Sequence, residues 1–544
     1  MIRKINLQIA LLLIFSACFI WLTFLTQGLP IGDPDDWDHV LAATDLPWKT
    51  LLSNLITPGS KSTIWSGQIN RMNEVLNQRL FRSIALKAVQ CVFNFKSFPY
   101  YLFSKVLFFS GTLTLLFYLI FKLTRSYWIA FAACLFFTAV PAHYAHVLWL
   151  SDPDTIAQFW MILSLFFFLQ VVGSLEEGKN KWTKALFFFF AAGWLAMKTK
   201  ESALVLPLSV GTFSFFQLLK QRQYKKEFLL CLLICFFLAF LIIPVSGLFA
   251  ANQPPASFKF ETVTRLVFKN YTCGYDDESA LAFFSLKQVW PVSIARTFGF
   301  YLLWTFVIFT FLYGIKSKFK IKPSDLHKKA LIWICLLWIL FWAFFVSSFQ
   351  PDPRYFSGVM IPVTILAAYF SGLVINTWTG VVKIGLISLI VFALSSNVFE
   401  NIQHIIFLRT QIGQRSNRFL NLAQIIFEDQ YGPAKISEIG RYYSAEYIQN
   451  PNSQSRIKDR TYYVKMDYGL WNRSEHPNLE EFEVYAKKGY SYYVTLNKDP
   501  VNINNHVRLI KTISGINENS LFERLTYQLK RKTPQPLYVL KWTP

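Results

Sequence analysis

The chain has 544 residues, of which 53% are hydrophobic, 18% aromatic and only 16% charged. One soluble core of this length cannot bury so much apolar surface, so the composition excludes a soluble globular protein and predicts a polytopic membrane protein. A formal net charge of +22 would suggest nucleic-acid binding in a soluble protein. Here the lysines and arginines fall largely in short clusters between apolar segments, where membrane orientation explains them, so no nucleic-acid partner is expected.

The first apolar run extends from Asn6 to Thr26 and follows Arg3 and Lys4. It exceeds the usual length of a signal-peptide core and lacks a small-residue cleavage site, so we expect an uncleaved first helix. Because positively charged flanks stay on the cytoplasmic side, the N-terminus is predicted inside and residues 28–100 are predicted to form an outer loop. Within this loop, Arg79 to Phe95 has the apolar spacing of a helix in the membrane interface.

Further apolar runs bring the expected number of membrane helices to about eleven, with the N-terminus inside and the C-terminus outside. Lysine and arginine clusters alternate between successive loops as the positive-inside rule requires, which supports this topology. The predicted spans are Tyr101 to Phe121, Tyr127 to Val147, Asp154 to Gly173, Ala185 to Met197, Ser202 to Leu219, Phe228 to Phe249, Arg296 to Ile315, Ala330 to Phe349, Phe356 to Asn376 and Val382 to Phe399.

The composition becomes polar and tyrosine-rich from about Asn401. We therefore predict a transmembrane domain at 1–400 and a small extracytoplasmic α/β domain at 401–544. One segment, Asn417 to Glu428, has the periodicity of a helix. Four others have the β-branched and aromatic content of strands: Thr461 to Met466, Ser491 to Leu496, Val507 to Ile513 and Leu537 to Trp542.

Unusual charged groups converge on the outer face if this topology is right. Carboxylates can act as general bases or hold a metal, whereas lysine and especially arginine suit phosphate. Together they indicate a site for a phosphate-bearing substrate and a hydroxyl or amine nucleophile. The groups are Asp35 and Asp36, Asp152 and Asp154, Lys198, Lys200 and Glu201, Asp276 and Asp277, and Arg354.

At these residues the chain resembles the GT-C superfamily of membrane glycosyltransferases, which includes protein O-mannosyltransferases and the transferases that add aminoarabinose to lipid A. The resemblance runs in order and spacing from about Leu7 to Phe399. The motifs that carry it are Pro34-Asp35-Asp36 in the first outer loop, Ala139 to Trp149 before Ser151-Asp152-Pro153-Asp154, the hairpin Lys198-Thr199-Lys200-Glu201-Ser202-Ala203 with Pro207, and Arg354-Tyr355-Phe356 with Pro362.

The resemblance implies transfer of a sugar from a polyprenyl-phosphate carrier to a protein, lipid or glycan acceptor, usually with inversion. Asp35 would be the general base, and Asp36 would orient it or bind a divalent metal with it; no other cofactor is implied. A phosphate leaves as an anion and needs positive neighbours. Lys198, Lys200 and Arg354 would supply them, with Asp152, Asp154 and Glu201 completing the substrate-binding set. We expect a bacterial inner or plasma membrane, with the site facing the periplasm or exterior.

Structural interpretations stand beside these roles. Asp152 and Asp154 precede a span and fit first-turn caps equally well. Lys198 and Lys200 could extend along a short helix end toward the interface, with Glu201 as their ion-pair partner. His143 and His146 have a spacing that a metal site could use, but we favour polar packing over metal binding there.

Two other functions remain open from the sequence. A lipid or glycan transporter or flippase would use the charged outer face as a substrate entrance. Transport predicts charges or helix breaks near mid-membrane and paired halves, whereas the charges here concentrate at one interface and no internal repeat is evident. A non-catalytic scaffold that carries the outer domain is the third possibility. The sequence favours the enzyme.

Overall fold

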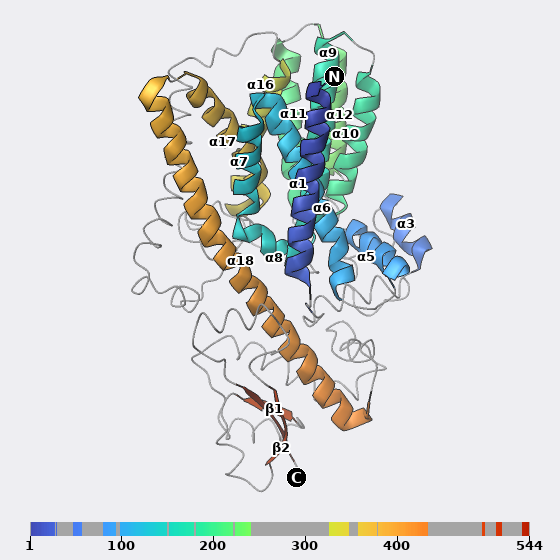
Figure 1. The fold of residues 1–544 in the computed structure, drawn as a ribbon. Helices are drawn as coiled ribbons and strands as arrows, with labels where there is room; N and C mark the ends of the chain where they lie inside the picture. Colours follow the sequence, from blue (N-terminus) through green and yellow to red (C-terminus); the bar gives the residue numbers. More distant parts are fainter. Residues whose placement is uncertain are drawn as a thin grey trace.

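The structure is a computed structural model that describes a helix bundle, a long helix leaving the bundle and a small sheet (Figure 1). Several predicted features, including Asp35, Asp36, Arg354 and the span Arg296 to Ile315, lie outside the described residues. The described residues are 2–27, 29, 47–56, 80–93, 98–148, 152–178, 181–220, 223–240, 326–347, 357–377, 379–433, 492–495, 507–513 and 536–542.

Apolar helices form the bundle, and two shorter helices, α3 (Trp48–Ile56) and α5 (Leu80–Phe93), lie beside its lower end in Figure 1. α5 falls within the segment predicted as an interfacial helix. The helices of the bundle are α1 (Ile2–Thr26), α6 (Phe98–Thr124), α7 (Tyr127–Thr138), α8 (Pro141–Leu148), α9 (Asp154–Glu176), α10 (Trp182–Met197), α11 (Val205–Lys220), α12 (Lys225–Phe240), α16 (Leu326–Ser347) and α17 (Ser357–Thr377).

Within the described residues, six helical segments are long and apolar enough to cross a membrane. Each coincides with a predicted span, which confirms an α-helical polytopic membrane fold. α10 has only 16 residues, in agreement with the short span predicted there. The six segments are Asn6–Thr26, Leu102–Thr124, Asp154–Glu176, Ser202–Lys220, Leu326–Ala343 and Ser357–Ile375.

The predicted span Tyr127 to Val147 is wrong as a single helix. α7 ends at Thr138, and a separate helix, α8, begins at Pro141. Proline lacks a backbone N–H and its ring collides with the carbonyl four residues earlier, so it ends one helix but suits the first position of the next. The break leaves α8 at the lower end of the bundle, where it carries His143 and His146 (Figure 1).

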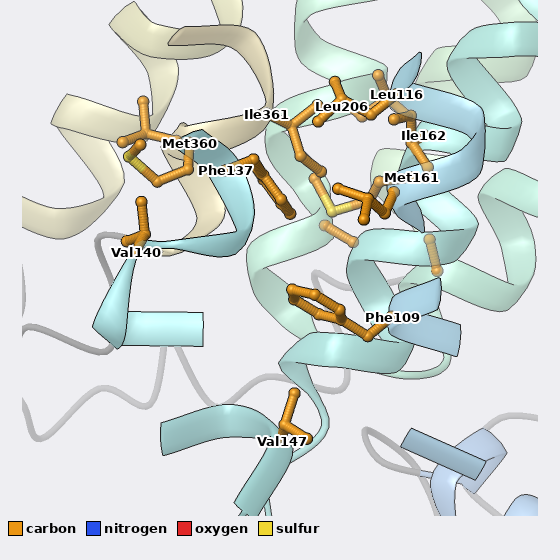
Figure 2. Packing of buried hydrophobic residues seen from close by; sticks show 14 of the residues in the cluster. Phe109, Leu116, Phe137, Val140, Val147, Met161, Ile162, Leu206, Met360 and Ile361 are labelled. Atoms are coloured by element: carbon orange, nitrogen blue, oxygen red, sulfur yellow. The ribbon is translucent and has the colours of Figure 1, made fainter. Parts of the chain in front are cut away.

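Large apolar side chains from neighbouring helices fill the bundle core. Phe109 of α6, Phe137 of α7 and Met161 of α9 are buried there together with Leu206 of α11 and Ile361 of α17 (Figure 2). This packing holds the helix ends that carry the ionisable residues.

One glycine permits an unusually close helix contact. A Cβ at Gly193 of α10 would lie 2.8 Å from Leu238 Cδ1 of α12. Small residues at such positions let helices approach in a bilayer, where association relies on close packing.

The longest element is α18 (Gly380–Tyr431), which has 52 residues and an expected length of about 78 Å. It starts beside the bundle and extends to the sheet (Figure 1). The boundary predicted at residue 400 falls inside this helix, because the sequence becomes polar there but no proline follows until Pro433. The predicted helix Asn417 to Glu428 is its C-terminal part.

The described strands form one antiparallel sheet with the order β1-β3-β2. β1 is Tyr492–Thr495, β2 is Val507–Ile513 and β3 is Leu537–Trp542, so three of the predicted strands are confirmed. The fourth, Thr461 to Met466, lies outside the described residues. Asp429 near the end of α18 accepts hydrogen bonds from the Tyr492 hydroxyl at 2.6 Å and from Lys541 Nζ at 2.7 Å. These bonds attach the sheet to the helix.

The two ends of the bundle differ in what they carry. The first residues of α1 lie at the upper end in Figure 1, whereas α8 and the sheet lie at the lower end. This arrangement agrees with a chain whose N-terminus and C-terminal segment are on opposite sides of a membrane. Which side is cytoplasmic stays a prediction.

Candidate functional site

Four ionisable side chains from three segments meet at the lower end of the bundle. His146 Nδ1 of α8 lies 2.6 Å from Asp152 Oδ2, in the segment before α9. Lys200, which follows α10, forms a close ion pair with Asp154 Oδ2 and lies 3.9 Å from Asp152 Oδ1. His146 Nδ1 is also 3.5 Å from Asp154 Oδ2. We call these four residues the buried charge cluster.

The start of α9 explains why the two aspartates point into this cluster. Asp152 Oδ1 accepts a hydrogen bond from the Asp154 backbone N–H at 3.0 Å, and Asp154 is the first residue of α9. A carboxylate at this place satisfies an orphan N–H and interacts favourably with the helix dipole. The capping interpretation of Asp152 is therefore correct. Its other oxygen remains available to bind His146, so capping and cluster formation occur together.

Burial and neighbouring charges have opposite effects on the pKa values of His146 and Asp152 in the cluster. All four residues are less than 9% exposed. Burial alone would raise the pKa of Asp152, but His146 and Lys200 hold that pKa well below its usual range. Burial alone would lower the pKa of His146, but Asp152 and Asp154 outweigh it and raise the pKa. Opposite charges at hydrogen-bonding distance thus favour the ionised forms of Asp152 and His146 in a place that disfavours isolated charges.

Lys198 is arranged differently, although it precedes Lys200 by two positions. It caps the C-terminal end of α10, it is only 4% exposed, and its ammonium lies 5.8 Å from the centre of the Trp194 ring. Burial lowers its pKa. Among the described residues, no carboxylate lies within ion-pair distance of Lys198, so none of them neutralises its positive charge.

The remaining predicted site residues are less fully described. Glu201 begins the 3₁₀ turn η2 (Glu201–Leu204), but its side chain lies outside what the structure describes, so its pairing stays a prediction. Asp35, Asp36 and Arg354 also lie outside the described residues.

No protein-family model and no curated protein matches the sequence. Among solved structures, the chain is similar to the crystal structure of ArnT from Cupriavidus metallidurans bound to undecaprenyl phosphate, with a TM-score of 0.46 and 13% sequence identity. The match covers 89% of this chain and 96% of that chain. At this level of similarity, the roles of individual residues have to come from the contacts of this chain.

The cluster also has the composition of a metal site. Ligand atoms of His146, Asp152 and Asp154 all lie within 4.8 Å of one another. However, Lys200 already forms ion pairs with both carboxylates, and a divalent cation would have to displace its ammonium. The described contacts of these residues are internal ion pairs, and the preference for polar packing over metal binding at His146 stays a prediction. The metal predicted at Asp35 and Asp36 lies outside the described residues.

Two residues of this region were missed as site residues by sequence reasoning. His146 was assigned to polar packing alone, yet it completes the cluster. Lys105 of α6 is 1% exposed and donates a hydrogen bond to the His146 carbonyl at 2.6 Å. A lysine inside a predicted apolar span is a signal of functional or structural importance by itself, because a charge in a bilayer is costly.

Proposed function

We propose that this protein is a membrane glycosyltransferase that moves a sugar from a polyprenyl-phosphate carrier to an acceptor at the lower end of the bundle in Figure 1. The observation that carries the proposal is Lys198, a buried lysine that no described carboxylate neutralises, beside a cluster whose charges balance internally.

The charge balance of this end favours an anionic ligand. Asp152 and Asp154 are the buried carboxylates among the described residues. The cluster uses both of them for Lys200 and His146, so none of the buried carboxylates among the described residues is left for Lys198, and a ligand is proposed to supply its counter-charge. A buried cation without a counter-ion is unfavourable, and a phosphate oxygen is a strong acceptor for an ammonium group. A carrier phosphate held at Lys198 would restore neutrality.

In the proposed step, the acceptor oxygen attacks the anomeric carbon of the sugar while Asp35 accepts the acceptor proton. The bond between that carbon and the phosphate oxygen breaks, and the electron pair leaves with the polyprenyl phosphate. Lys198 and Arg354 would stabilise this leaving anion, whereas Asp36 would orient Asp35 or share a divalent metal with it. An oxyanion that leaves in this way needs positive charge more than a proton donor.

Lys200 has a different role in this proposal from a simple phosphate ligand. Asp152 and Asp154 hold its ammonium in place and balance its charge, so its proposed role is to keep the hairpin that carries Lys198 in a fixed position rather than to bind the phosphate. Glu201 follows directly and would complete the substrate-binding set on the same hairpin. A charge fixed in this way, here that of Lys198, stabilises developing charge without reorganisation during the reaction.

The site is proposed to face the exterior or periplasm, as the charge alternation of the loops predicts. Its acceptor would be a protein, a lipid or a glycan. The ArnT structure holds undecaprenyl phosphate, a carrier of the class proposed here. For this chain, the carrier is proposed from its own motifs and charges.

The direct test is transfer of labelled sugar from a polyprenyl-phosphate donor by the purified full chain and by Asp35→Asn. Removal of a general base lowers rates by about 100-fold or more, so we expect Asp35→Asn to lose at least that much in kcat. Monodisperse elution in detergent checks that both proteins are folded. Equal transfer by both would remove Asp35 from the mechanism, and movement of intact donor across vesicles without transfer would favour a transporter.

A further inference from the structure

Arg409, in the middle of α18, binds the end of α1 from which the acidic segment departs. Its Nε donates to the Leu25 carbonyl at 3.1 Å and its Nη2 donates to the Gln27 carbonyl at 2.7 Å. Arg409 is only 2% exposed, although it lies in the polar half of the helix. These bonds join Arg409 to residues that precede it by 384 and 382 positions in the sequence.

We infer that Arg409 is a positioning residue that sets where the acidic segment with Asp35 and Asp36 begins. This inference rests on the proposed function, because it assigns to Arg409 a role in that reaction from outside the donor and acceptor sites. The last carbonyls of a helix have no partner within it and carry partial negative charge. The planar guanidinium satisfies two of them at once, which a lysine ammonium cannot do with the same geometry.

A second residue shows that α18 is shaped around this contact. Gly413 lies one turn after Arg409, and a Cβ at this position would lie 2.5 Å from Arg409 Nη1 and 3.4 Å from Leu29 Cδ2. Any larger residue therefore has to push the guanidinium away. Because the obstructed atom is the end of a flexible side chain, the protein can accommodate alanine by moving Arg409 rather than by unfolding.

The end of α1 is also tied to the helix that carries His146. Trp21 Nε1 of α1 donates to the Tyr144 hydroxyl of α8 at 3.0 Å, and that hydroxyl donates to the Thr138 carbonyl at 2.8 Å. Arg409 and Tyr144 thus both bind the last part of α1. The point where the chain leaves α1 is consequently placed beside the end of the bundle that contains the buried charge cluster.

The distance along the chain from this anchor to the proposed base is short. Leu29 is 2% exposed, and Asp35 follows it by six positions. Even a fully extended chain of six residues reaches only about 20 Å. A shift of the anchor therefore changes the region that Asp35 can reach, and misplacement of a reacting group by about 1 Å can cost about 100-fold in rate.

The test uses Arg409→Lys and Gly413→Ala in the full chain, with Gly385→Ala as the matched control. Gly385 lies in the same helix, and a Cβ there would meet nothing within 4 Å. With the polyprenyl-phosphate donor, we expect both Arg409→Lys and Gly413→Ala to lower kcat by about tenfold or more. The donor KM should stay within about twofold, because the phosphate site is untouched. Gly385→Ala should keep wild-type kcat.

The outcomes separate this inference from the proposed function. Wild-type kcat in both variants, with Asp35→Asn inactive, would leave the transferase standing and overturn the role of Arg409. A fall in kcat that accompanies an equal rise in donor KM and a lower melting temperature would show a merely structural contact and would also overturn it. An inert wild type would remove both claims.

Discussion

At each end of α9, a histidine from another helix pairs with a carboxylate, and the two pairs differ chiefly in burial. At the start of α9, His146 and Asp152 have side chains that are 2% and 8% exposed. At its end, His327 Nδ1 lies 2.9 Å from Glu176 Oε2, with side chains 40% and 18% exposed. Glu176 also accepts hydrogen bonds from the backbone N–H groups of Leu326 and His327, so it caps α16.

This comparison separates a structural contact from a candidate site. A partly exposed ion pair is screened by water and contributes about 0–1 kcal/mol. A buried charge that loses its partner costs far more, about 3–5 kcal/mol. The protein therefore depends on the complete set of partners at the start of α9, whereas His327 can be lost from the pair at the other end with little effect. The buried cluster includes Lys200, two positions after Lys198, and no carboxylate among the described residues lies within ion-pair distance of Lys198. This is the arrangement proposed above for binding a charged substrate.

The largest expected effect is that of Lys200→Met. It would leave Asp152 and Asp154 with fewer positive neighbours in a buried place, so we expect a loss of about 3–5 kcal/mol in stability. The measurement is chemical or thermal unfolding in detergent. Lys184→Met is the matched control, because Lys184 is exposed and lies near the Phe188 ring at the other end of α10.

The double variant Lys200→Met with Asp154→Leu sharpens this prediction. Replacing both members of a buried pair by apolar groups is often nearly neutral. We therefore expect the double variant to recover at least half of the lost stability. No recovery would show that Lys200 is not stabilised by Asp154.

Much of the bundle was predictable, because long apolar runs have few alternatives to membrane helices. The strands Val507–Ile513 and Leu537–Trp542 followed from their β-branched and aromatic residues. The break before α8 had a local signal, which is Pro141 itself. The prediction of one continuous span relied on hydropathy and ignored that proline. The continuity of α18 past residue 400 had no such local signal. A change from apolar to polar residues does not by itself end a helix.

The charge cluster was predictable only in part. The motifs singled out Asp152, Asp154 and Lys200, and the structure brings them together. Which lysine pairs with the carboxylates depends on the turn after α10 and on the packing of α9 against α10. Nothing local in the sequence distinguishes Lys200, which is paired, from Lys198, which has no described carboxylate partner.

The next effect in size compares the two histidines directly. His146→Ala removes a buried hydrogen bond between charged groups, which is worth about 1.5–3 kcal/mol. His327→Ala breaks a partly exposed pair and should cost less than about 1 kcal/mol. Unfolding of the two variants under identical conditions measures the difference. Equal losses would break the comparison between the two ends of α9.

The smallest effect is the pH dependence of the buried pair. The pKa of His146 is raised above its ordinary value of 6.5. Its stabilisation is therefore fully present below about pH 6.5 and is lost as the pH rises through the raised pKa. The stability difference between wild type and His146→Asn should be larger at pH 6 than at pH 9. The pKa of Asp152 is lowered, so its contribution persists above its ordinary value of 3.8 and is lost only in stronger acid.

The central claim is that Lys198 supplies the positive charge for a carrier phosphate, and donor kinetics test it most directly. The measurement is the apparent donor KM for sugar transfer by wild type, Lys198→Ala and Lys184→Ala. Loss of a charge-assisted hydrogen bond worth about 1.5–3 kcal/mol predicts a KM about 10- to 100-fold higher for Lys198→Ala and an unchanged KM for Lys184→Ala. A donor KM for Lys198→Ala that equals those of wild type and Lys184→Ala would contradict the claim.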